Sequence, residues 1–151
     1  MLAQSFEFHS AKAVIITPVA IDHPQQLTIK TGDGKDMVIM SGVAVVRYYG
    51  PDGDFRQWTR DELDIRNIGP IWNEKPSTIA FITVNTLTSQ DTPNGMGVDG
   101  ILPAVFDSNT KQITLKANIA AFWKSQMTRI GYYAIAVGNC KFHEVTTGNC
   151  E

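Results

Sequence analysis

The chain has 151 residues, of which 43% are hydrophobic and only 19% charged, with a formal net charge of −2 at pH 7. A chain of this length is typical of one domain with a sizeable core, so we expect a single domain over residues 1–151. A slightly acidic chain without a basic stretch argues against a nucleic-acid partner, because nucleic-acid-binding proteins normally carry a basic face.

The N-terminal part predicts strands rather than a targeting segment. Phe6 and Phe8 alternate with polar residues, which is the pattern of a half-buried strand. The apolar run over residues 13–21 follows Lys12, as in a signal peptide, but it is far too short to span a membrane. We therefore expect a pair of strands at the start of the chain.

The next part of the sequence predicts one hairpin after another. Turns at 31–36 and 50–54 contain glycine, which tolerates positive φ, and the second also contains proline, which presets φ in tight turns. Ser41 and Gly42 interrupt an apolar stretch, which predicts a bulge or a short break. The expected strands are 26–30, 37–40, 43–49 and 55–58.

Residues 59–87 give one helical signal and one strong strand signal. Thr59 followed by Glu62 matches a capping box, which predicts a short helical turn over 63–66. Residues 77–87 form the strongest predicted strand and are apolar on both faces. We expect a strand of that kind in the middle of a sandwich or under a covering element.

The rest of the chain again predicts strands, at 101–106, 112–119 and 131–137. In 112–119, apolar residues that face a core alternate with exposed polar residues. Residues 120–127 fit either a short helix or a bulged strand. The spacing of strands and turns predicts an all-β fold, an antiparallel β-sandwich of about nine or ten strands with at most one or two short helical turns.

The only two cysteines, Cys140 and Cys150, each end a Gly-Asn-Cys tripeptide near the C-terminus. A hairpin that turns at Val145 would place them opposite each other, within reach of a disulfide. We therefore predict a disulfide, which favours a secreted or extracellular protein, whereas two free thiols in a cytoplasmic protein are the alternative. A metal site formed by both cysteines and His143 is a further alternative, although its spacing does not match known zinc sites.

The sequence carries no catalytic signature. No Gly-x-Ser-x-Gly motif is present, and the three histidines, His9, His23 and His143, are scattered along the chain. The paired acidic residues lie in predicted turns or in the first turn of the predicted helix. No glycine-rich phosphate loop follows a strand. We expect a protein that is not an enzyme.

The longest predicted loop, 88–100, is the first candidate site. Asp91, Asn94 and Asp99 supply the oxygen ligands that Ca²⁺ accepts, although their spacing departs from that of the EF-hand. Calcium is the one cofactor that the sequence suggests. A plain surface loop built from turn residues is the alternative.

Aromatic residues form the second candidate site. They are Tyr48, Tyr49, Trp58 and Trp72, with Asn73 beside them. A sugar site needs flat aromatic rings for the apolar side of the sugar and planar polar groups for its hydroxyls, and this set offers both. The alternative is that the aromatic side chains pack in the core.

These features favour a secreted, lectin-like, non-enzymatic binding module with a carbohydrate ligand. A small β-sandwich with one disulfide loop near its C-terminus resembles the thermostable direct haemolysins, a family of pore-forming toxins. The resemblance covers only the segment around Cys140 and Cys150 and rests on cysteine spacing. It implies a cytolytic protein that contacts membranes, which is the second hypothesis. A structural subunit of a homo-oligomer is the third.

Overall fold

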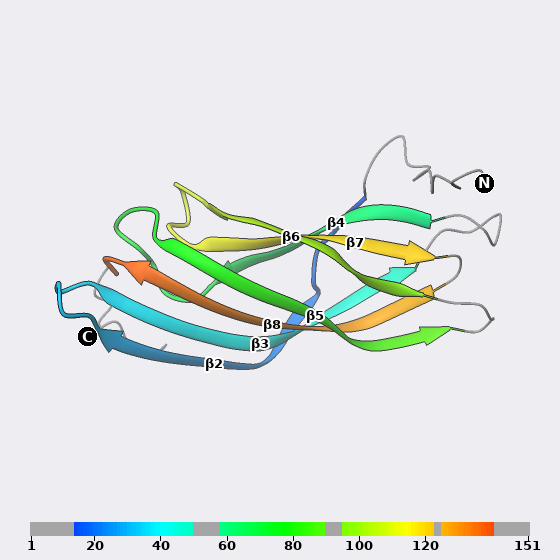
Figure 1. Ribbon diagram of the computed structural model, residues 1–151, viewed down its shortest axis with the longest axis horizontal. Coiled ribbons are helices and arrows are strands. Elements are labelled where there is room, and N and C mark those ends of the chain that lie inside the picture. The colour runs from blue at the N-terminus through cyan, green and yellow to red at the C-terminus, as the bar shows by residue number, and fades with distance from the viewer. Residues whose placement is uncertain (1–13, 50–57, 90–94, 123–124, 141–151) are drawn as a thin grey trace, which may run out of the picture.

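The computed structural model describes residues 14–49, 58–89, 95–122 and 125–140. Within these residues the chain forms eight β-strands and no helix, and two four-stranded sheets pack as a sandwich (Figure 1). The predicted all-β sandwich is confirmed. The strands are β1 (Ile15–Ile16), β2 (Ala20–Lys30), β3 (Asp36–Tyr49), β4 (Trp58–Ile68), β5 (Ser77–Ser89), β6 (Met96–Phe106), β7 (Ile113–Phe122) and β8 (Ser125–Gly138).

The first sheet has the strand order β1-β4-β7-β6, and the second has the order β2-β3-β8-β5. All neighbouring strands are antiparallel except β1, which pairs with β4 in parallel through its two residues. In Figure 1 the second sheet lies along the lower side of the molecule. The strands β5 and β6 contact each other where the two sheets meet.

The core lies between the two sheets and is formed by the inward residues of each strand. The alternation in β7 follows the sequence prediction, because its apolar residues are buried while Thr114, Lys116 and Asn118 are partly exposed. The buried residues of β7 are Ile113, Leu115, Ala117, Ile119 and Ala121. They face the buried residues of β3 and β8, which include Val38, Met40, Ala134 and Ala136.

The predicted helical turn over 63–66 is wrong, because these residues belong to β4. Leu63 and Ile65 are both fully buried, which is the two-residue period of a strand that faces the core. Glu62 does not cap a helix and instead forms an ion pair with Lys116 of β7. Burial of the strand therefore overrides the local capping signal.

The predicted interruption at Ser41 and Gly42 is also wrong. The strand β3 pairs with β8 without a break through this point, where Gly42 lies opposite Tyr132. The irregularity lies in the neighbouring strand β2, between Asp22 and Gln25. There His23 adopts φ of 48°, which is a rare conformation for a non-glycine residue.

The predicted central strand 77–87 corresponds to β5, which lies at the edge of the second sheet. Of the two positions predicted for it, the middle of the sandwich is therefore wrong, while a position under a covering element stays a prediction. The loop that follows is shorter than expected, because β5 continues to Ser89 and β6 already begins at Met96. The ambiguous segment 120–127 is strand on both sides of residues 123–124.

Several predictions fall on residues outside the described part of the chain. These are the strand expected around Phe6 and Phe8, the turn at 50–54 with most of the strand that follows it, and everything after Cys140. Among the described residues, no helix is long and apolar enough to cross a membrane.

Candidate functional site

The outer side of the second sheet is apolar over half of its length. The strand register places one apolar residue from each of the four strands in a single row across this side, namely Leu27, Ile39, Ile135 and Ile79. Directly opposite residues in neighbouring antiparallel strands point to the same side, with Cβ atoms about 4.5–5.5 Å apart. The row is therefore a continuous apolar band from one edge of the sheet to the other.

Two further rows flank this band. On one side Ile29, Met37 and Val137 lie in register, and on the other Phe81 lies opposite Tyr133. The rings of Phe81 and Tyr133 have their centroids 6.5 Å apart and are tilted by 44°. We refer to the nine residues of the three rows as the apolar face: Leu27, Ile29, Met37, Ile39, Ile79, Phe81, Tyr133, Ile135 and Val137.

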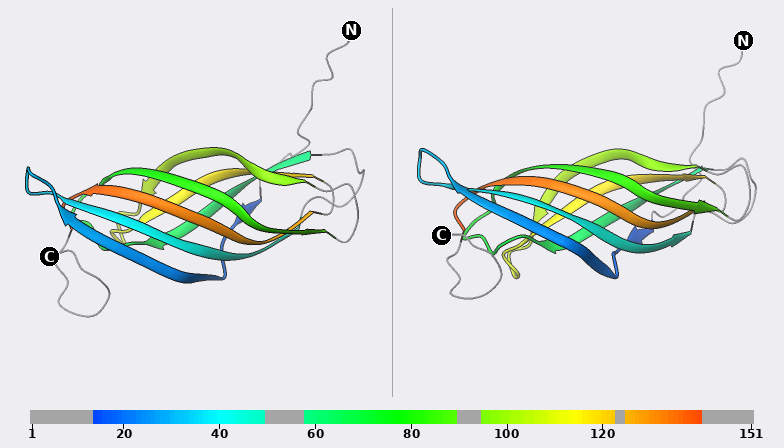
Figure 2. Two further views of the ribbon diagram at one scale, coloured as in Figure 1. Left: turned by 60° about the horizontal axis from the view of Figure 1, so that its bottom comes forward. Right: turned by 90° about the horizontal axis from the view of Figure 1, so that it is seen from below.

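The apolar face points away from the core because its residues alternate with buried ones. In β3, Val38 and Met40 are buried on the inner side, so Met37 and Ile39 lie on the outer side. In β5, the buried residue is Ile82. These strands thus carry apolar residues on both sides, which is the composition of a strand that is covered on both sides. The view from below in Figure 2 looks onto this sheet, and no described strand covers it.

The exposed area of the apolar face is large. Ile79 is 65% exposed, Phe81 59%, Leu27 57%, and Ile29 and Tyr133 41% each, while the other four residues are partly exposed. With roughly 180 Å² for a fully exposed large side chain, the nine residues expose about 600 Å². The largest apolar patch of a typical monomer is about 300–600 Å² and often marks a binding surface.

The outer side of the first sheet is different, because it carries ion pairs. Arg60 of β4 binds Asp99 of β6, with 2.5 Å between the guanidinium nitrogen and the carboxylate. Lys116 of β7 binds both Glu62 and Asp64 of β4. The hydrogen bond to Glu62, followed by that to Asp64, raises the pKa of Lys116. The two outer sides of the sandwich therefore have opposite character.

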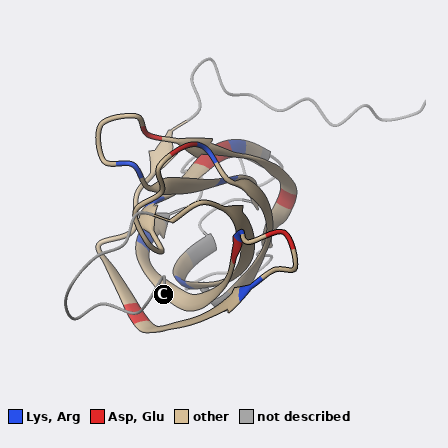
Figure 3. Ribbon diagram, turned by 90° about the vertical axis from the view of Figure 1, so that its left-hand side faces the viewer, with Lys and Arg blue, Asp and Glu red and all other residues tan. Residues whose placement is uncertain are grey.

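Two ion pairs of opposite sign flank the apolar face. Arg129 lies 3.2 Å from Asp22 beyond one end of the three rows, and Lys30 lies 2.5 Å from Asp36 beyond the other. Figure 3, a view along the strands, shows that both acidic and basic residues are distributed around the molecule. Each of these two flanking pairs is therefore neutral.

The two predicted sites are not brought together as a pocket by the described residues. Trp72 is fully buried and Tyr48 is nearly so. Both side chains therefore pack in the core, which was the alternative to a sugar site. Asn73 is exposed at the end of the sandwich, and its side-chain amide donates to the carbonyl of Cys140 at 3.5 Å. The side chains of Tyr49 and Trp58 lie outside the described part.

Of the three predicted calcium ligands, only Asp99 lies among the described residues. Asp91 and Asn94 lie outside the described residues, so the site as a whole stays a prediction. Asp99 lies in β6, where its carboxylate binds Arg60. Among the described residues, no group of three or more His, Cys, Asp or Glu side chains is placed to hold a metal ion.

A buried polar pair joins the core to the N-terminal strand. The hydroxyl of Tyr48 donates a hydrogen bond to the carboxylate of Asp61, and both residues are buried. The same carboxylate accepts the backbone N–H of Val14 at 2.9 Å, next to β1. Burial, together with the bond to Asp61, raises the pKa of Tyr48. The pair holds β1 against β4, which is a structural role.

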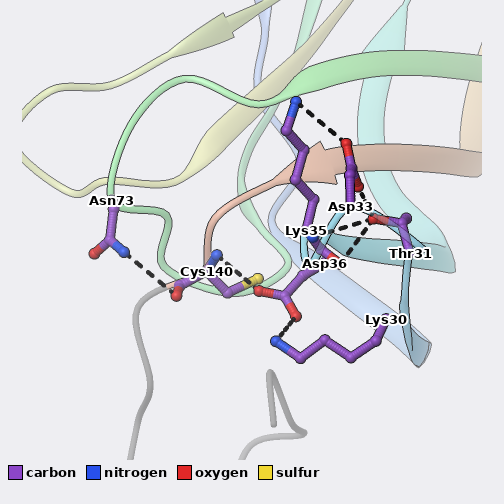
Figure 4. A network of polar contacts seen from close by, with 7 residues as sticks. All are labelled: Lys30, Thr31, Asp33, Lys35, Asp36, Asn73 and Cys140. Atoms are coloured by element: carbon purple, nitrogen blue, oxygen red, sulfur yellow. Dashed lines mark hydrogen bonds and ion pairs between the residues drawn. The ribbon is translucent and has the colours of Figure 1, made fainter.

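The backbone of Cys140 is fixed at the opposite end of the sandwich (Figure 4). Its N–H donates to the buried carboxylate of Asp36 at 3.1 Å, and Lys30 binds the other oxygen of that carboxylate. Cys140 also forms a β-bridge with Trp72. The described chain is therefore held in place at Cys140. Cys150 lies outside the described residues, so the disulfide between the two cysteines stays a prediction.

No protein-family model matches this chain, and no curated protein or solved structure matches it. Function therefore has to be argued from the residues themselves. Sequence reasoning missed the apolar face, although one of its signals is present. Residues 77–87 are apolar on both sides, but the same pattern fits either a central position in the sandwich or a position under a covering element, and the sequence prediction left both open.

Proposed function

We propose that this protein is a non-enzymatic binding module that acts through the apolar face, and that its ligand is an apolar protein surface. The observation that carries the proposal is the row Leu27, Ile39, Ile135 and Ile79, which crosses the whole sheet without a polar residue. A continuous exposed apolar patch rimmed by polar residues is typical of protein–protein contact sites.

The size of the face is sufficient for a specific contact. Removing about 600 Å² of apolar surface from water contributes roughly 15 kcal/mol before any cost, at about 25 cal/mol per Å². Association itself costs about 4–15 kcal/mol, mostly in lost freedom of motion. A partner that covers the face and buries apolar surface of its own therefore binds with a favourable net free energy.

A carbohydrate ligand has less support. The described part of the aromatic set gives no open ring, since Tyr48 and Trp72 lie in the core. The rings of Phe81 and Tyr133 are exposed, but aliphatic side chains surround them, whereas a sugar needs polar partners for its hydroxyls. Carbohydrate binding, like the cytolytic alternative, stays a sequence prediction.

The proposal is tested by introducing a charge into the face. Phe81→Glu places a carboxylate in it, and Val105→Glu is the matched control, since Val105 is 49% exposed on β6 of the other sheet. We expect the wild type either to bind the apolar dye bis-ANS when dilute or to associate when concentrated. Phe81→Glu should lose both properties, and Val105→Glu should keep them. A wild type that neither binds the dye nor associates contradicts the proposal.

A further inference from the structure

We infer that the partner of the apolar face is a second copy of this chain, packed against it sheet on sheet. This inference rests on the proposed function and names the partner of that same surface. Three properties of the face support it: its charge, its area and the position of its centre. Each of them is matched by the same face of another copy.

The charge of the face fits its own copy. The nine residues carry no charged group, and the ion pairs Arg129–Asp22 and Lys30–Asp36 at its two ends are each neutral. Neither the nine residues nor these two pairs offer a net charge to a strongly charged partner. A lipid surface normally attracts proteins through an excess of Lys and Arg around the apolar residues, whereas Arg129 and Lys30 at the two ends of the face are each paired with a carboxylate. A neutral apolar face of the same kind fits without repulsion.

The area fits a dimer of ordinary size. Two copies that cover each other's faces bury about 600 Å² each, or about 1,200 Å² in total, which is the lower bound of a standard protein–protein interface. Partly exposed residues next to the rows, such as Ser41 and Val43, add to this value. The contact is large enough for a specific dimer without any further surface.

The topology fits a two-fold contact. The strands β3 and β8 are the two inner strands of the sheet, so Ile39 and Ile135 lie at the centre of the apolar face. A two-fold axis in the plane between two packed sheets makes the contact self-complementary. Whether this axis runs along the strands or across them, the pair Ile39–Ile135 faces the same pair of the other copy when the axis passes through this centre. Packed sheets lie about 10 Å apart, a distance that these side chains fill.

The inference is tested by the mass of the full chain in sedimentation equilibrium over a range of concentrations. We expect the wild type to reach twice the chain mass of 16.7 kDa. Phe81→Glu and Ile79→Glu should weaken the dimer more than 100-fold, because each buries an unpaired carboxylate in both copies. Val105→Glu should leave the dimer unchanged. Circular dichroism and thermal unfolding of each variant monitor the fold.

A second measurement locates the contact without relying on disruption. The photoreactive residue p-benzoylphenylalanine is placed at Ile135, in the centre of the face, or at Val105, on the other sheet. Irradiation should give a covalent dimer only from the first position. A cross-link from Val105 and none from Ile135 means that the copies meet through another surface, which overturns the inference.

Failure of this inference can be separated from failure of the proposed function. A wild type that is monomeric at all concentrations overturns the inference that the partner is a second copy. The proposed function still stands if the monomer binds the dye and Phe81→Glu abolishes this binding. A dimer that Phe81→Glu and Ile79→Glu do not weaken also overturns the inference. A monomer that co-sediments with neutral phosphatidylcholine vesicles, and loses this in Phe81→Glu, identifies a lipid surface in its place.

Discussion

Gly42→Ala is expected to destabilise the protein because the ring of Tyr132 occupies the space that a side chain would need. A Cβ at Gly42 would lie 2.5 Å from the Tyr132 hydroxyl oxygen, 2.7 Å from Cζ and 2.9 Å from Cε1. Tyr132 is only 7% exposed, so its ring has little room to move. Overpacking of a core costs about 1–3 kcal/mol, and the gain from replacing glycine offsets about 0.4–1 kcal/mol of this. The net loss should be about 1–2 kcal/mol.

The free energy of unfolding is measured by guanidinium chloride titration of the wild type and the variants. Gly97→Ala is the matched control, because Gly97 is also a strand residue but a Cβ added there would meet no atom within 4 Å. It should be neutral or slightly stabilising. In the Tyr132→Leu background the cost of Gly42→Ala should largely disappear. An equal cost with and without the ring would refute the steric explanation.

Three further predictions concern the buried groups and the chain end. Tyr48→Phe removes the hydroxyl that donates a hydrogen bond to the buried carboxylate of Asp61. It should lower the free energy of unfolding by about 1–3 kcal/mol, measured by chemical denaturation. The raised pKa values of Tyr48, Tyr132 and Lys116 mean that the folded state holds these protons more tightly than the unfolded chain. Their contribution is complete below about pH 10 and is lost as the pH rises through the raised values, which unfolding titrations between pH 8 and 11 should show. Cys140→Ser should cost about 2–3 kcal/mol if the predicted disulfide closes the short C-terminal loop.

Each of these predictions has its own contrary result. Tyr48→Phe should cost much less in an Asp61→Ala background, and equal costs would mean that the two side chains are not coupled. Stability that stays flat up to pH 11 would contradict the effect of the raised pKa values, and Tyr132→Phe should reduce the loss because it removes one of the titrating groups. Two thiols that react with Ellman's reagent in the unreduced protein would rule out the disulfide.

The sequence was sufficient for the fold class and for the strands whose two sides differ. The strand β7 was predicted residue by residue because Ile113 and Leu115 face the core while Lys116 faces water, which gives a clear period of two. The strand β4 was missed because its polar residues imitate a helix start. The partner that binds Glu62 is Lys116, which is distant in the sequence, and no local pattern reveals such a pair.

The position of β5 and the candidate sites needed the structure. Apolar residues on both sides of a strand show that both sides require cover, but not whether the cover is part of the same chain. Residues such as Ile79 and Phe81 therefore suggested a strand in the middle of the sandwich or under a covering element. Whether Tyr48 and Trp72 are open to a ligand depends on how the two sheets pack against each other, which a list of aromatic residues does not contain.

The irregularity in β2 has a consequence for how the proposed dimer would avoid further growth. An edge strand with free backbone groups invites the strands of other molecules to extend the sheet, which leads to fibres. At the edge formed by β2, Pro24 lacks an N–H and His23 turns the backbone out of the extended conformation. At the opposite edge β5 contacts β6. Lateral extension of the sheet is thereby disfavoured at the start of β2, and in the proposed dimer a contact through one face of one sheet ends with two molecules.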